Sequence, residues 1–527
     1  MIGGMGVKSY GQMGEWTWMN GDSTENSLGH YGIQGVFDSL NAPPALYEAC
    51  EWTDLNGNFW LFGGVDHLSK VYGDLWEFNP LINEWAWIRG PGISNQYGIY
   101  GTQGISSPNN NPGCRGYGIM SWVDSSNNLW FFGGYGYSAN QNGCLGDLWE
   151  YSINTDEWTW MKGSDSISYI GNYGTIGIEN SLNNPRSRDE NNGTWTDGFN
   201  NLWLFGGRPF SGGNLNDLWK FNIANNCWTW INGSDSSNYP SSYGIKGIPD
   251  TNNNPGAKYV YSTWKGQNND LWMFGGDFKN DLWRYNIASN IWTWMSGTNY
   301  SDTFGNYGAN CISSVNFISR CKYENRAHWT LNCDNFINFG GMTINYVMND
   351  LWNYNVYSNE WTLINGNSLL SQHGSYGIKY VSNSTNIPSS RLGSIGWKDL
   401  NGNLWMFGGQ NYTGYRCNDM WRFVPDTTCP YLCNQTTEIK ETPNNKSEIS
   451  LYPNPTSGIF TLTYNSQFSI LNSQLEIYDV LGQEVYHQAI INQESTIINL
   501  PQLSNGVYFY QLSNSKETYR GKFVKEN

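Results

Sequence analysis

The sequence predicts an all-β protein in two parts, a six-bladed β-propeller followed by a small immunoglobulin-like β-sandwich. The propeller is predicted by an internal repeat: six times a tryptophan lies eleven residues before a diglycine, and successive diglycines are 70, 73, 69, 65 and 68 residues apart. A unit that cannot bury its own apolar faces must stack on copies of itself. The six pairs are Trp52/Gly63, Trp122/Gly133, Trp195/Gly206, Trp264/Gly275, Trp329/Gly340 and Trp397/Gly408.

Each repeat contains four predicted strands, which are short aromatic-rich runs bounded by Asn, Gly or Asp. The first strand is centred on the tryptophan, and the second is an apolar run that ends in the diglycine, as in residues 59–64. Because that run is apolar at consecutive positions, we expect sheets to cover it on both faces. The third strand contains Asp-Leu-Trp and the fourth Trp-x-Trp, as at Trp85 and Trp87. Four-stranded antiparallel sheets stacked into a ring are the blades of a propeller.

The number of blades follows from the two ends of the repeat region. The third-strand motif occurs six times, but a fourth-strand motif follows only five of its copies. The missing copy lies near the start of the chain, in residues 15–19. We therefore expect residues 15–19 to pair with the sheet that ends near Phe423, because this pairing closes the ring and hides two strand edges that otherwise invite aggregation.

The same pattern predicts the domain boundaries. Residues 15–424 are predicted to form the propeller, and residues 1–14 are interpreted as the remnant of a preceding segment. Residues 425–448 are rich in Thr, Asn, Pro and Glu and are predicted to be a linker. Alternating apolar and polar runs separated by turn residues predict the sandwich over residues 449–527.

The repeats resemble a known family. A diglycine followed by a spaced aromatic residue and then tryptophan is the kelch pattern, and residues 15–424 resemble kelch repeats of secreted bacterial proteins in all six copies. The repeats are longer than the usual kelch length of about 50 residues, because an insert with a Tyr-Gly motif follows each fourth strand. These motifs begin at Tyr31, Tyr97, Tyr173, Tyr243, Tyr307 and Tyr376.

The predicted topology places all the variable loops on one rim. Adjacent antiparallel strands alternate in direction, so the loops after the second strands and the inserts after the fourth strands share a rim, here called the insert rim. The short turns after the first and third strands share the opposite rim, the turn rim. Length variation on one rim of a rigid scaffold is typical of binding surfaces. The sequence therefore predicts a binding or interaction module with a glycan or protein ligand.

Two sets of residues on the insert rim are candidates for ligand binding. A basic residue recurs where the insert enters the next repeat, with Leu46 in its place in the first repeat, and it either bonds carbonyls within its own insert or helps to cradle an anion or sugar acid. Tyrosines of the loops either stack on sugar rings or pack the loops. The candidates are Arg115, Arg188, Lys258 and Arg391, and Tyr135, Tyr137, Tyr412 and Tyr415.

The alternative function is a carbohydrate-active enzyme. Galactose oxidase, a kelch-like propeller, holds copper with two His and two Tyr, so the resemblance implies that an enzyme could be built on this fold. The predicted propeller contains His30, His67, His328 and His373, none of them in a tight ligand spacing. The motif of Asp54, Asn56 and Asn58 resembles half of a calcium loop but lacks the glutamate at position twelve, so a hairpin turn is favoured. The sequence assigns no catalytic residue, metal or cofactor.

Composition excludes two further classes of function. With 28 basic and 44 acidic residues the net charge is −16, so nucleic acid is not an expected partner. No apolar run approaches the length of about 18 residues that a transmembrane helix needs.

Ten cysteines occur without Cys-x-x-Cys spacing. For an extracellular protein the expected disulfides are Cys114–Cys144 and Cys429–Cys433, and free buried thiols are the alternative.

The C-terminal segment looks like the type A sorting domain of the type IX secretion system of Bacteroidota. The resemblance implies a partner, the type IX machinery, and a location outside the cell or on the outer-membrane surface. Cargo of this system also carries an N-terminal export signal, and residues 1–14 lack one, so we expect the start to be misassigned or the signal to have been removed. The sorting motifs contain Pro453, Asn454, Pro455, Gly458, Gly482, Gly506 and Lys525.

Overall fold

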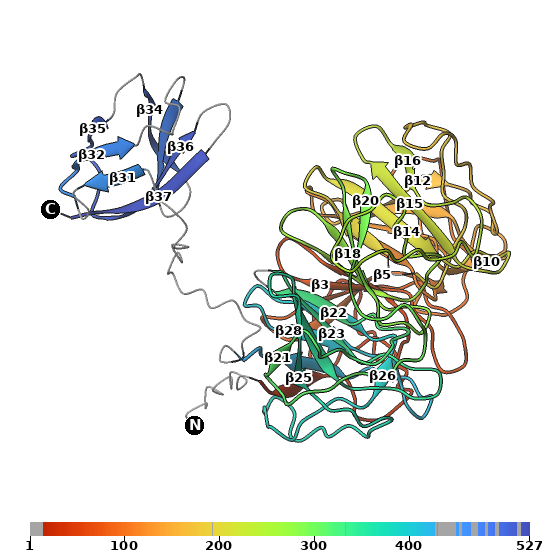
Figure 1. The fold of residues 1–527 in the computed structure, drawn as a ribbon. Helices are drawn as coiled ribbons and strands as arrows, with labels where there is room; N and C mark the ends of the chain where they lie inside the picture. The colour runs from red at the N-terminus through yellow and green to blue at the C-terminus, as the bar shows by residue number, and fades with distance from the viewer. Residues whose placement is uncertain are drawn as a thin grey trace. The chain divides into compact units, whose positions relative to one another are not determined.

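A computed structural model shows an all-β chain that divides into two compact units, residues 1–434 and 435–527 (Figure 1). The residues that the structure describes contain strands and no α-helix, and among them no helix is long and apolar enough to cross a membrane. The described residues are 14–191, 193–331, 334–426, 429, 449–452, 456–464, 473–479, 483–490, 495–513 and 518–526.

The first unit contains six antiparallel sheets with four principal strands each. In five of them the strands follow one another in sequence order, as the repeats predict. The first and second sheets are β2 (Cys50–Thr53), β3 (Phe59–Phe62), β4 (Leu75–Asn79) and β5 (Glu84–Arg89), and β7 (Met120–Val123), β8 (Asn128–Phe132), β11 (Asp147–Ser152) and β12 (Glu157–Gly163). The third and fourth are β13 (Thr194–Thr196), β14 (Asn201–Gly207), β15 (Leu215–Asn222) and β16 (Cys227–Asn232), and β17 (Ser262–Lys265), β18 (Leu271–Phe274), β19 (Leu282–Asn286) and β20 (Ile291–Ser296). The fifth is β22 (His328–Leu331), β23 (Asn335–Phe339), β24 (Leu351–Asn355) and β25 (Glu360–Asn365), with β21 (Ser313–Ser314) at its edge.

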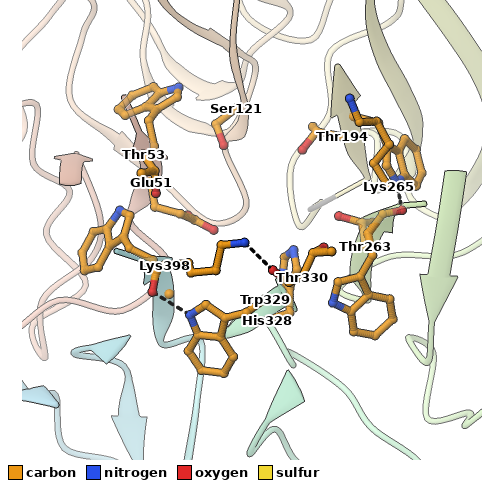
Figure 2. A pocket seen from close by; sticks show the side chains of 15 residues that line it. Glu51, Thr53, Ser121, Thr194, Thr263, Lys265, His328, Trp329, Thr330 and Lys398 are labelled. Carbon is orange, nitrogen blue, oxygen red and sulfur yellow. Dashed lines mark hydrogen bonds between the residues drawn. The ribbon is translucent and has the colours of Figure 1, made fainter. Parts of the chain in front are cut away.

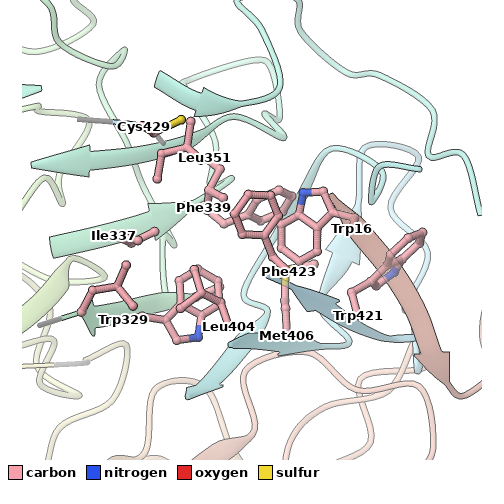
Figure 3. Close-up of a cluster of buried hydrophobic side chains, with 13 residues drawn as sticks. Trp16, Trp329, Ile337, Phe339, Leu351, Leu404, Met406, Trp421, Phe423 and Cys429 are labelled. Carbon is pink, nitrogen blue, oxygen red and sulfur yellow. The ribbon is translucent and has the colours of Figure 1, made fainter. Parts of the chain in front are cut away.

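The sixth sheet joins the two ends of the repeat region. It consists of β27 (Ile395–Lys398), β28 (Leu404–Phe407), β30 (Met420–Phe423) and β1 (Trp16–Asn20). Strand β1 pairs antiparallel with β30, with Trp16 opposite Phe423 and Trp18 opposite Trp421. The segment expected to supply the missing fourth strand therefore occupies that place. Figure 3 shows Trp16 packed beside Phe339, Trp421 and Phe423 in a buried cluster.

Hydrogen bonds from the repeat tryptophans link each sheet to the next. In each sheet the indole of the first-strand tryptophan donates to a carbonyl at the same position of the following sheet's second strand, over 2.9–3.3 Å. The last of these bonds runs from Trp397 in the sixth sheet to Trp60 in the first. The first strands also contact one another in order, and β27 contacts β2. The series of contacts therefore returns to the sheet from which it started.

The inserts explain why the repeats are long. Each insert runs beside the outer edge of the fourth strand of the sheet that it precedes, as at the bridges Asp38–Trp85 and Ser107–Trp158. In five repeats an insert asparagine donates its amide to a carbonyl of that strand over 2.9–3.2 Å, which satisfies an edge that would otherwise be free to pair with another chain. The asparagines are Asn41, Asn110, Asn183, Asn253 and Asn386.

Smaller strands build the insert rim. Strands β6 (Arg115–Gly116), β9 (Tyr135–Tyr137) and β10 (Asn142–Cys144) form a three-stranded sheet, and β26 (Arg391–Leu392) pairs with β29 (Gln410–Asn411). Strand β9 lies between β6 and β10. Strands in a sheet are about 4.8 Å apart, so β6 and β10 are separated by about twice that distance.

The structure corrects both expected disulfides. Cys114 and Cys144 are buried free thiols. Cys114 directly precedes β6 and Cys144 ends β10, and β9 lies between these two strands, whereas a disulfide needs Cα atoms within about 7 Å. Cys429 pairs with Cys311, with their Cα atoms 5.0 Å apart, so it is not bonded to Cys433, which lies outside the described residues. This bond ties the segment after β30 to the insert of the fifth repeat, 118 residues earlier in the chain.

The second unit contains two antiparallel sheets that share one core. One consists of β31 (Ile449–Tyr452), β32 (Ile459–Tyr464) and β35 (Ser495–Asn499), and the other of β34 (Glu484–Ile490), β33 (Ser473–Tyr478), β36 (Gly506–Ser513) and β37 (Thr518–Lys525). Side chains from both sheets, such as Phe460 and Phe523, pack in a single buried cluster.

Candidate functional site: the insert rim and the central cavity

The aspartate of each Asp-Leu-Trp motif anchors the insert to its sheet. It accepts a hydrogen bond from an insert tyrosine hydroxyl in all six sheets, over 2.5–2.7 Å. In five sheets it also accepts a bond from the indole two residues later, over 2.7–2.8 Å. In the second insert the donor is Tyr100 and not Tyr97, because two Tyr-Gly pairs occur there and the sequence motif was matched to the first.

The four basic candidates are buried in the same anchors. Their side chains are at most 2% exposed and pair with the motif aspartates Asp147, Asp217, Asp281 and Asp419 at 2.6–2.7 Å. Each also donates to the carbonyl of the first glycine of its own diglycine. Of the two roles that the sequence left open, the structure therefore places these cations in the internal one, where they present no exposed charge to a ligand. The four are Arg115, Arg188, Lys258 and Arg391.

A fifth cation of this kind escaped the sequence analysis. Lys322 donates to Asp350 at 2.9 Å and to the carbonyl of Gly340. Its insert lacks the Asn-x-Pro motif that marked the other basic residues. The signal that would have found it is spacing, because Lys322 lies eighteen residues before its diglycine, as Arg115 and Arg188 do.

The first sheet lacks the cation and its aspartate titrates differently. Burial acts to raise the pKa of Asp217, but the charge of Arg188 and its hydrogen bonds outweigh burial and hold that pKa below its ordinary value. In the first sheet Leu46 replaces the cation. Burial there raises the pKa of Asp74 to about 6, although Tyr31 and the backbone of Gly92 donate hydrogen bonds to it.

Asp74 is therefore expected to make the stability of the first unit depend on pH. The pKa of Asp74 is higher in the folded state than in the unfolded state, so protonation stabilises the fold. This stabilisation is fully present below about pH 4 and is lost as the pH rises through about 6. Asp74→Asn mimics the protonated form and is expected to be up to about 3 kcal/mol more stable than the natural chain at pH 7 and equal to it at pH 4. Urea unfolding at both pH values measures this, and a difference that does not change with pH would contradict it.

The four tyrosine candidates lie on the insert rim in two places. Tyr135 and Tyr137 are half-buried in β9, and Tyr137 makes an edge contact with Tyr97. Tyr412 contacts His373, with its hydroxyl 2.7 Å from the Nδ1 atom, and Tyr415 is 48% exposed. Tyr137 and Tyr412 pack against the same buried hydrophobic cluster, which therefore lies under one tyrosine of each pair. A cavity of about 130 Å³ lies beside His373 and Tyr412.

A central cavity of about 340 Å³ is lined by the first strands of all six sheets. Figure 2 shows Glu51, His328 and Lys398 around it, with Lys398 donating to the carbonyl of Thr330. Burial raises the pKa of Glu51 to about 7, although the charge and hydrogen bonds of Arg326 act against it. Burial lowers the pKa of His328 to about 4. The remaining lining combines hydroxyl and tryptophan side chains with Lys265 and Gly396. The hydroxyl residues are Thr53, Ser121, Thr194, Thr263 and Thr330, and the tryptophans are Trp52, Trp195, Trp264, Trp329 and Trp397.

The turn rim carries a second cavity of about 570 Å³. It shares Lys265, Thr330 and Lys398 with the central cavity and is also lined by Phe199 and Asp334. The half calcium loop of the sequence lies on this rim. The carboxylate of Asp54 accepts hydrogen bonds from the backbone N–H groups of Asn56 and Asn58, and so it stabilises the turn.

The histidines of the first unit do not converge. Within the part of the chain that the structure describes, the groups of His, Cys, Asp or Glu close enough to share one metal ion contain no histidine. Two such groups are found, and one of them is the disulfide pair with Asp426. The other consists of Glu48, Glu190 and Glu324.

In the second unit the described sorting residues lie together. Gly506 and Lys525 are opposite each other in β36 and β37. Gly458 has a φ of +107°, and a Cβ atom on it would lie 3.0 Å from the Cε atom of Lys525. The other expected sorting residues, Pro453, Asn454, Pro455 and Gly482, lie outside the described residues.

Comparison with known proteins identifies the second unit. A family model for the secretion system C-terminal sorting domain matches residues 450–526. No curated protein matches the chain. The match shows a sorting domain of the type IX secretion system, consistent with Bacteroidota, and it indicates export to the cell surface or the extracellular space.

Proposed function

We propose that the protein is a secreted or surface-displayed binding module, built on a six-bladed kelch-type β-propeller and exported by its sorting domain. The propeller is supported by the six successive four-stranded sheets, by the pairing of β1 with β30 and by the tryptophan bonds that return from the sixth sheet to the first. The kelch assignment is supported by the diglycines, in which both residues have positive φ in every repeat, as at Gly63 and Gly64. The domain boundaries proposed are those of the sequence: the propeller at 15–424, preceded by residues 1–14, a linker at 425–448 and the sorting domain at 449–527.

The observation that carries the binding function is the distribution of exposed aromatic side chains. Eight aromatic side chains of the inserts and of the loops after the second strands are exposed, against two in the turns of the opposite rim, Phe199 and Tyr357. Aromatic side chains held on rigid loops are enriched in binding surfaces and stack on sugar rings or protein side chains. The eight are Tyr97, Phe210, Tyr239, Tyr300, Phe304, Tyr346, Tyr380 and Tyr415.

The ligand class proposed is an extracellular glycan or protein. The four basic candidates form buried ion pairs with aspartates, so the proposed ligand does not need to be an anion. The half-buried candidates Tyr135, Tyr137 and Tyr412 lie on the same rim and are proposed to border the exposed set. The natural chain, labelled and applied to a glycan array and to a panel of extracellular proteins, is expected to bind a defined ligand.

A matched pair of variants tests the surface. Replacing Phe210, Tyr346 and Tyr415 together by alanine is expected to weaken binding by about tenfold or more, because central aromatic contacts each contribute about 1 kcal/mol or more. The control replaces Phe199 and Tyr357, which are 83% and 67% exposed on the other rim, and is expected to bind as the natural chain does. Equal loss in both variants, or loss only in the control, would contradict this surface.

The central cavity favours a second candidate, a carbohydrate-active enzyme. A concave site that holds a carboxyl group with a raised pKa beside a neutral imidazole has the composition of a general acid–base site. In that case the natural chain would cleave or oxidise a sugar, and Glu51→Gln would abolish turnover without loss of binding at the insert rim.

A further inference from the structure

Three glutamates occupy equivalent positions in alternate sheets at the insert-rim end of the central cavity. Just before each first strand, one residue adopts a left-handed backbone conformation, with φ between 49° and 60° in all six sheets. Successive members are joined by backbone hydrogen bonds of 2.8–3.2 Å, from Glu48 through Gly393 to Glu324, and on towards the second sheet. The six residues are Glu48, Tyr117, Glu190, Val260, Glu324 and Gly393.

The side chains of the three glutamates converge. Each offers a carboxylate oxygen, and these oxygens all lie within 4.8 Å of one another. Glu48 is fully buried and Glu324 is 5% exposed, whereas Glu190 is partly exposed. The sheets that carry them are the first, third and fifth, so the convergence depends on the cyclic arrangement of the sheets.

Glu48 is also unpartnered. Neither of its carboxylate oxygens has a hydrogen-bond partner among the residues that the structure describes. One oxygen of Glu190 is likewise without a partner in the described part of the chain. Glu324, by contrast, accepts a hydrogen bond from the hydroxyl of Tyr47. A fully buried carboxylate without donors is costly unless a positive charge neutralises it.

The protein's own cations do not balance this group. The group and its immediate surroundings contain five carboxyl groups and three guanidinium groups, a formal excess of two negative charges when every group is ionised. Arg326 lies 3.6 Å from Glu51 rather than against Glu48, and Arg416 stacks over Tyr47 at 4.5 Å. The carboxylates are Glu48, Glu51, Asp189, Glu190 and Glu324, and the guanidinium groups are those of Arg208, Arg326 and Arg416.

We propose that Glu48, Glu190 and Glu324 bind one hard divalent cation of the calcium class. Three carboxylates offer up to six oxygen ligands, and Ca²⁺ takes six to eight oxygens in flexible geometry. The converging atoms include neither imidazole nitrogen nor thiolate, which zinc and copper prefer. The cation would neutralise the two excess charges and tie three alternate sheets together.

The titration of the group is consistent with this site. Burial raises the pKa of Glu324 to about 8, and the charge of Glu190 adds to the effect while hydrogen bonds from Tyr47 and Tyr323 and the charge of Arg326 act against it. Burial followed by the charges of Glu190 and Glu324 also raises the pKa of Glu48. A bound cation would oppose both shifts, because an opposite charge favours the ionised carboxylate.

Calorimetric titration of the full-length chain with Ca²⁺ after treatment with a chelator tests the site. We expect one Ca²⁺ per chain and a higher melting temperature at ~5 mM Ca²⁺, a concentration above the dissociation constants of about 10⁻⁴–10⁻³ M typical of extracellular modules. The absence of both heat and a melting shift at that concentration would overturn the proposal.

Three variants locate the bound ion. Glu48→Gln and Glu190→Gln are each expected to weaken Ca²⁺ binding by about tenfold or more, since each removes a charged ligand. Glu190 is partly exposed, so its variant remains informative if the buried substitution impairs folding. The control is Glu150→Gln in β11, whose pKa burial also raises, to about 7, but which lies outside the group. Unchanged affinity in Glu48→Gln and Glu190→Gln, or equal loss in Glu150→Gln, would overturn the assignment.

Discussion

Replacing Asp217 by asparagine is expected to destabilise the six-sheet unit by about 3–5 kcal/mol. Asp217 is fully buried. It accepts hydrogen bonds from the Nη1 and Nη2 atoms of Arg188 at 2.7–2.8 Å, and also from the hydroxyl of Tyr173 and the indole of Trp219. Asparagine keeps the size of the side chain but leaves Arg188 as a buried, uncompensated charge. Urea unfolding at pH 7, followed by tryptophan fluorescence, measures the change.

The matched control is Asp74→Asn, because Asp74 occupies the same position in the first sheet without a cation partner among the described residues. That substitution is expected to be neutral or stabilising at pH 7. If both variants lose the same free energy of unfolding, the loss reflects the Asp-Leu-Trp position itself and not the ion pair. A neutral Asp217→Asn would contradict the role assigned to the buried cations.

Trp16→Ala is expected to cost about 3–5 kcal/mol, the usual range for deleting a large buried aromatic side chain. Trp16 is fully buried, and its ring centroid lies 5.1 Å from that of Phe423 and 5.5 Å from that of Phe339 (Figure 3). Because Phe339 belongs to the fifth sheet and Phe423 to the sixth, the cavity would open between two sheets at the point where β1 is added.

The control for Trp16 is Trp18 in the same strand. Its ring is only partly buried, where it contacts Tyr376 of the neighbouring insert. Trp18→Ala is therefore expected to cost less than half as much as Trp16→Ala, again measured by urea unfolding. A marginal effect of Trp16→Ala would show that β1 contributes little to the packing of the unit.

The order of strands in each sheet could be predicted from the sequence, because each strand carries its own motif. The pairing of residues 15–19 with the last sheet could be predicted for the same reason, since Trp16 and Trp18 repeat the Trp-x-Trp motif. Short-range motifs also mark the sorting domain, and Gly506 and Lys525 lie within the residues that the family model matches.

The partners of individual side chains could not be predicted in this way. The basic residues were visible, but nothing in a local motif decides whether Arg188 faces a ligand or a buried aspartate 29 residues later. The Cys311–Cys429 bond joins residues 118 positions apart. The glutamate group has no motif at all, because Glu48 and Glu324 belong to the first and fifth sheets and lie far apart in the sequence.

Hydrogen exchange of the backbone amides in β1 of the intact natural chain tests closure of the six sheets most directly. Residues near a chain terminus normally fray and exchange fast. If β1 completes the sixth sheet, the amides of Trp16–Asn20 that bond to β30 will be as protected as those of the fourth strands β5 and β12. Exchange of these amides at the rate of an unstructured terminus would show that the ring is open and that the insert rim is not one continuous surface.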